Sequence, residues 1–194
     1  MSLKGDAVAI IDIPGFVADI KEHATHHQFH IHDERHFVET YSMNQAWEVD
    51  LHPEHACGGP LDLRLSIDLD PRVALAFEDQ VMSLPDDAEP ETGLTIPLVF
   101  TWALPPLTDA PDLLVLATEL AGVGGADLPL KVAAIDSTAE VTDAAERTLS
   151  ISALIEISLD DIFMHREPLS DLFDRSYEVS EFLLDRAPAW LGEI

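Results

Sequence analysis

Residues 61–70 read LDLRLSIDLD, and this stretch decides the fold class of the chain. Leucine or isoleucine occupies every odd position, and aspartate, arginine or serine occupies every even one. Successive side chains of a β-strand point to opposite faces of a sheet, so the alternation predicts a strand with one apolar face and one solvated face. Burying five aliphatic side chains contributes roughly 1.5–3 kcal/mol each, so a second layer is expected over the apolar face.

A second alternating segment lies near the C-terminus. The odd positions from 149 to 159 are all apolar, and the even positions between them are serine, leucine or glutamate. Strands with one polar face favour an antiparallel sheet, because parallel sheets are usually covered on both faces. The two segments are therefore expected to lie in one antiparallel sheet.

Two predicted helices supply the covering layer. Apolar residues at helical spacing over 13–20 predict an N-terminal helix that runs to about Thr25. A second stripe over 169–184 predicts a helix that begins at Pro168 and ends before Pro188. The fold class expected is α+β, a mainly antiparallel sheet with one face covered by an N-terminal and a C-terminal helix.

The rest of the chain is interpreted as one domain, residues 1–194. Segments 72–82 and 112–121 are compatible with either a helix or a strand. The remaining expected elements are, in chain order, a polar histidine-dense connection at 26–36, strands at 37–43 and 45–51, an acidic surface loop at about 83–93, and strands at 94–104 and 130–141.

The charge balance restricts the partners. The chain has 37 acidic and 10 basic residues, for a formal net charge of -27. Such a surface repels phosphate backbones and anionic lipids, so we expect no nucleic-acid and no membrane partner. No apolar run approaches the ~18–20 residues that span a bilayer. A basic protein partner fits the charge, and an adaptation to salt or a compositional bias of the source organism fits it equally well.

Cysteine usage bears on the cellular compartment. Cys57 is the only cysteine, so the chain forms no internal disulfide, which fits a reducing compartment. The N-terminal residues lack the cleavage pattern of a secretory signal. We therefore expect a cytoplasmic protein, and the sequence is compatible with a homo-oligomer.

Histidines are the densest chemical signal. Eight of the nine lie between residues 23 and 55. Imidazole and thiolate are ligands for zinc and related transition metals. The alternative is that titratable histidines lie on a solvated connection, with no metal and no other cofactor. The metal-ligand candidates are His30, His32, His52, His55 and Cys57.

Catalytic motifs are weak by comparison. Residues 32–36 read HDERH, which has Asp33 where the His-Glu-x-x-His motif of zinc peptidases has its glutamate, and the flanking residues are more typical of a strand than of a helix. No Gly-x-Ser-x-Gly elbow and no phosphate loop is present. We assign no catalytic residue, and the sequence favours a non-catalytic binding protein of adaptor, chaperone or inhibitor type over an enzyme. The alternative function is a histidine-rich metal-binding protein or metal-dependent hydrolase.

Overall fold

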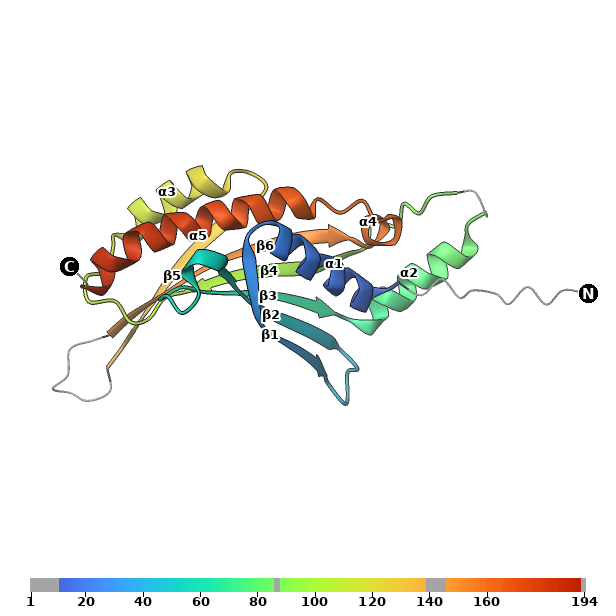
Figure 1. Ribbon diagram of the computed structural model, residues 1–194. Coiled ribbons are helices and arrows are strands. Elements are labelled where there is room, and N and C mark those ends of the chain that lie inside the picture. The colour runs from blue at the N-terminus through green and yellow to red at the C-terminus, as the bar shows by residue number, and fades with distance from the viewer. Residues whose placement is uncertain (1–10, 86–87, 139–145, 193–194) are drawn as a thin grey trace, which may run out of the picture.

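The computed structural model describes residues 11–85, 88–138 and 146–192. Its centre is a six-stranded antiparallel sheet with the strand order β1-β2-β3-β4-β6-β5 (Figure 1). The strands are β1 (Phe29–Val38), β2 (Gln45–Pro53), β3 (Asp62–Leu69), β4 (Thr95–Ala103), β5 (Leu130–Ser137) and β6 (Glu146–Ser158). The helices are α1 (Ile13–His26), the 3₁₀ turn η1 (Glu54–Ala56), α2 (Pro71–Ser83), α3 (Leu113–Gly124), α4 (Leu159–Met164) and α5 (Leu169–Leu191). The predicted α+β class is confirmed.

The alternating stretch 61–70 forms β3, near the middle of the sheet. Leu65 lies opposite Val49 of β2 on one side and Phe100 of β4 on the other. All three side chains are fully buried. The odd residues of β3 thus belong to one continuous apolar layer across neighbouring strands, as the period of two requires.

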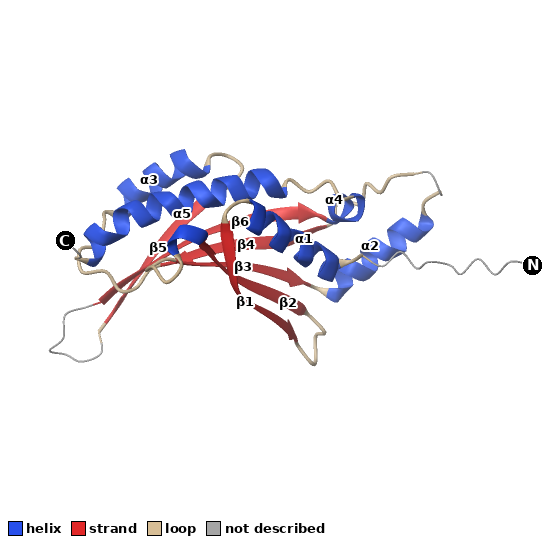
Figure 2. Cartoon of the chain, in the orientation of Figure 1, coloured by secondary structure: helices blue, strands red, loops and turns tan. Residues whose placement is uncertain are grey.

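Helices α1, α3 and α5 cover this apolar face (Figure 2). The predicted N- and C-terminal helices are confirmed, and α3 is a third helix on the same face. Along α5 the side chains at helical spacing from Leu169 to Leu183 are buried, including two serines. The Trp102 indole N–H of β4 donates a 2.9 Å hydrogen bond to Ser180 Oγ, so the polar groups brought into the core are paired.

Helix caps resolve the two ambiguous segments. The Asp70 side chain accepts a hydrogen bond from Arg72 N at the start of α2, and Asp112 accepts from Leu114 N and Val115 N at the start of α3. These bonds pair amide groups that have no partner inside the helix. Segments 72–82 and 112–121 are therefore helices. No helix in the described ranges is both long and apolar enough to cross a membrane.

Three sequence-based boundaries are wrong. The first strand is β1 at Phe29–Val38 rather than 37–43, because an edge strand with one solvated face accepts the polar residues of the histidine-dense stretch. Residues 39–44 instead form the turn of the β1–β2 hairpin, with Met43 at φ 61°. Helix α5 also continues through Pro188 to Leu191, since the lost N–H falls only in its last turn.

The acidic loop is held to the start of α4. Ser158 caps α4, and the Asp160 carboxylate accepts hydrogen bonds from Thr92 N, Thr92 Oγ1 and Gly93 N. The described part of segment 83–93 that follows α2 is a loop, as predicted, and residues 86–87 lie outside the described ranges.

Candidate functional site

The face of the sheet opposite the helices is solvated, and it is divided into a charged half on β1, β2 and β3 and a sparsely charged half on β4, β6 and β5. We call it the open face. On β1, β2 and β3 its side chains include five carboxylates and two guanidiniums, whereas β4 contains no charged residue. The charged side chains are Asp33, Arg35, Glu48, Asp50, Asp62, Arg64 and Asp68. The sparsely charged half includes Val99, Thr101, Ser152 and Leu154, of which Leu154 is 54% exposed, and its charged side chains include Glu156 and Lys131.

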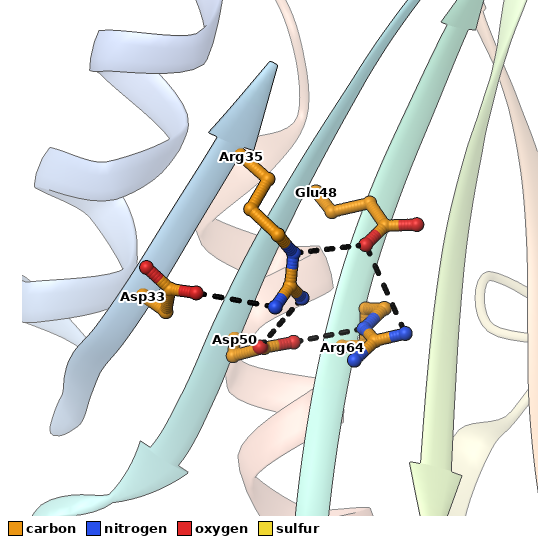
Figure 3. A network of polar contacts seen from close by, with 5 residues as sticks. All are labelled: Asp33, Arg35, Glu48, Asp50 and Arg64. Carbon is orange, nitrogen blue, oxygen red and sulfur yellow. Dashed lines mark hydrogen bonds and ion pairs between the residues drawn. The ribbon is translucent and has the colours of Figure 1, made fainter. Parts of the chain in front are cut away.

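Two arginines and three carboxylates form a network across the charged half (Figure 3). Arg35 Nη2 donates to Asp50 Oδ2 at 2.6 Å, and Arg64 Nε donates to Asp50 Oδ1 at 2.8 Å. Glu48 also contacts both guanidiniums, at 3.2 Å and 3.8 Å. The strand register places Arg35 opposite Glu48 and Asp50 opposite Arg64, which is the geometry in which cross-strand side chains meet.

The network keeps Asp50 ionised. Partial burial acts to raise the Asp50 pKa, but hydrogen bonds from Arg64 and Arg35 outweigh it and hold the pKa below its usual range. The hydrogen bond to Asp50 raises the pKa of Arg35 in turn. A carboxylate with both oxygens bonded to guanidiniums is a fixed negative charge, and it is unsuited to exchanging protons near neutral pH.

A pocket of about 280 Å³ adjoins the network at one end of β2 and β3. Its lining residues are His32, Asp50, His52, Asp62, Leu63, Arg64, Thr101 and Ala103. The His32 and His52 rings meet edge to face, with centroids 5.2 Å apart. Asp62 is exposed and is not one of the carboxylates that bond Arg64. The pocket therefore combines two imidazoles with an accessible carboxylate.

The structure divides the predicted metal ligands among three places. His32 and His52 line the pocket, and His30 Nδ1 lies 3.6 Å from Cys57 Sγ. His55 contacts Glu181 of α5, with Nε2 and Oε1 3.2 Å apart. Within the described ranges, no three or more histidine, cysteine, aspartate or glutamate side chains are grouped to hold a metal ion. Metal binding by these residues stays a prediction.

A bulge in β1 accounts for part of this division. The register with β2 shifts between Ile31 and Asp33, so His32 is the extra residue on its strand. The HDERH stretch lies in β1, and it lacks the helix that the peptidase motif requires. Its two histidines also have different surroundings, since His36 stacks on Trp47 with centroids 4.3 Å apart.

The arginine network was missed by the sequence analysis. Arg64 was visible as a polar alternate of β3, but its partners Glu48 and Asp50 on β2 depend on strand register. An arginine at position 35 and two carboxylates at alternate positions of 48–50 were the available signal. The chain matches no protein-family model, no curated protein and no solved structure. Its function is therefore argued from its own geometry.

Proposed function

We propose that this chain is a non-catalytic binding protein that holds a basic partner on the open face of its sheet. The observation that carries the proposal is the one-sided placement of the helices (Figure 2), which leaves the opposite face with a pocket, exposed carboxylates and a sparsely charged surface beside them.

The charges of the open face indicate the chemistry of the partner. Arg35 and Arg64 are both bonded to carboxylates, so they are not available to attract an anion. Asp62 and Asp68 are exposed and bond neither arginine. A lysine or arginine side chain would meet Asp62 at the pocket, and the net charge of -27 would steer a basic partner toward the protein.

The sparsely charged half of the open face supplies a different contact. Interface cores are depleted of charged residues and their rims are polar. Val99 and Leu154 lie opposite each other on adjacent strands, between the Thr101–Ser152 pair and the Pro97–Glu156 pair. The partner that fits is therefore a segment with basic residues and apolar residues side by side.

The direct test is titration with a short peptide of alternating lysine and leucine, followed by calorimetry at several salt concentrations. We expect binding that weakens as salt rises. The double variant Asp62→Asn/Asp68→Asn should bind several-fold more weakly, because it removes two accessible carboxylates of the open face.

The matched control is Glu22→Gln/Asp185→Asn, which removes two exposed carboxylates from α1 and α5. This control should retain the affinity of the unmodified protein. Equal losses in the two variants would mean that the peptide responds to net charge alone, and the open face would then have no special role.

Zinc binding is the second candidate, favoured by the 5.2 Å separation of the His32 and His52 rings. Two neutral imidazoles supply half of a tetrahedral zinc shell. Titration of the untagged protein with Zn²⁺ should then show one site that is lost in His52→Ala and kept in the His165→Ala control. Uptake that is the same in both variants would exclude the pocket as the zinc site.

A further inference from the structure

The two edges of the sheet are protected very differently. At the β1 edge, the strand is interrupted by the bulge at His32 and carries Asp33, Glu34 and Arg35 in succession. Bulges and charged side chains are the usual means by which an edge strand avoids pairing with another chain. Strand β1 is therefore built to remain an edge.

Strand β5 is less protected than β1. It pairs with β6 over eight residues without a register shift, and in the described part of the chain its backbone bonds to no other strand. Its charged residues are Lys131 and Asp136, which lie near its two ends, and the Asp136 carboxylate is bonded to Arg147 of β6. Ala133 and Ile135 are exposed, Ile135 to 67%. The edge thus presents unpaired N–H and C=O groups along an apolar strand.

Helix α3, which packs on β5, extends this apolar margin. A helix that is apolar nearly all round is normally buried. Glu119 is the one charged residue of α3, yet Leu114 is 77% exposed and Val115 58% exposed. The edge strand and the helix packed on it therefore both expose apolar side chains and have few charges, on a strongly acidic protein.

We propose that β5 pairs antiparallel with β5 of a second copy of this chain. A two-fold axis near Ala133 would place Val132 opposite Ala134 of the second copy and join the two sheets into one. Because the axis is perpendicular to the sheet, both α3 helices would lie on the same side of the junction, where they add apolar area. The two open faces would also lie side by side.

The geometry of the edge identifies the second copy as the occupant, and charge restricts where two copies can meet. Two chains of net charge -27 repel each other, so they associate most easily where few carboxylates are free. The β5 edge and α3 are such a place, because their carboxylates, Asp136 and Glu119, each contact an arginine, whereas a basic partner would be drawn to the acidic surfaces elsewhere. An edge strand is also self-complementary about a two-fold axis, since each copy offers the groups that the other lacks.

The test is the mass of the full chain in solution, measured by light scattering and sedimentation across salt concentrations. We expect a dimer whose population grows as salt rises, because screening weakens the repulsion. Peptide binding at the open face has the opposite salt dependence, so the two proposals fail separately. A wild-type protein that is monomeric at every salt concentration would overturn the pairing.

The decisive variant is Ala133→Glu, which places two carboxylates opposite each other at the axis. It should raise the dimer dissociation constant about tenfold or more. Ala133→Gln, of similar size and no charge, should leave the dimer intact, as should Val38→Glu on β1. A dimer that resists Ala133→Glu, or that is lost in Val38→Glu instead, would contradict the assignment.

Hydrogen exchange provides a readout that needs no variant. In the dimer, β5 amides that point away from β6 should become protected as the protein concentration rises, while β1 amides should not change. Exchange at β5 that is independent of concentration over the range in which a dimer forms would overturn the proposal.

Discussion

The two faces of the sheet are formed by alternate residues of the same strands, yet they have different roles. On the helix side, Leu65, Phe100 and Trp102 are buried against one another and against α5. On the open side, their sequence neighbours Arg64 and Thr101 line a solvated pocket. The helix-covered face therefore supplies most of the packing energy, and the open face is available for binding.

The largest effect is expected on the covered face. Phe100 is fully buried and its ring lies 5.9 Å from that of Phe173 on α5. Phe100→Ala should reduce the free energy of unfolding by about 3–5 kcal/mol, because it leaves a cavity between sheet and helix. Urea denaturation would measure the loss. A loss below 1 kcal/mol would mean that the two layers are not packed as described.

A smaller loss should follow from the buried polar contact between the same layers. Ser180→Ala leaves the Trp102 indole N–H without its acceptor and should cost about 1–3 kcal/mol. Ser176→Ala is the matched control, because the Ser176 hydroxyl donates only to the Leu172 carbonyl within α5. If both variants lose the same free energy of unfolding, the hydrogen bond between Trp102 and Ser180 contributes no more to stability than the bond within α5.

The arginine network tests whether the open face also contributes to stability. Asp50→Asn should cost about 1–3 kcal/mol at neutral pH, because the carboxylate bonds two guanidiniums and is partly buried. The folded pKa of Asp50 is lowered, so its contribution is present above the unfolded pKa of about 3.9. The difference from wild type should shrink as the pH falls through the folded pKa.

Asp62→Asn is the control for this experiment, since it removes one carboxylate from the same face without touching the network. It should leave the unfolding free energy nearly unchanged. An Asp50 effect that persists in strong acid would mean that the loss has a cause other than the ionised carboxylate.

The smallest effect is expected in the sparsely charged half of the open face. Leu154→Ser should change the unfolding free energy by no more than about 0.5 kcal/mol, because the side chain is 54% exposed. The same variant should weaken binding of the lysine–leucine peptide. A large loss of stability, measured by thermal denaturation, would show that Leu154 is covered by part of the protein.

Much of the fold follows from periodicity. The alternation at 61–70 and 149–159 locates β3 and β6, and the helical stripes over 13–20 and 169–184 locate α1 and α5. Each of these elements buries one face. The spacing of apolar residues along its sequence therefore predicts which side chains are buried. Strand β1 was misplaced because it is an edge strand, and its polar residues carry no such pattern.

The sequence by itself determined the fold class, the two main strands and the covering helices, because the hydrophobic period is a local property. Only the tertiary structure decided which charges meet. Arg35, Asp50 and Arg64 come from three strands, and His30 is brought to Cys57 while His55 lies against α5. Such contacts depend on register, on a one-residue bulge and on strand order, and none of these is encoded in the spacing of neighbouring residues.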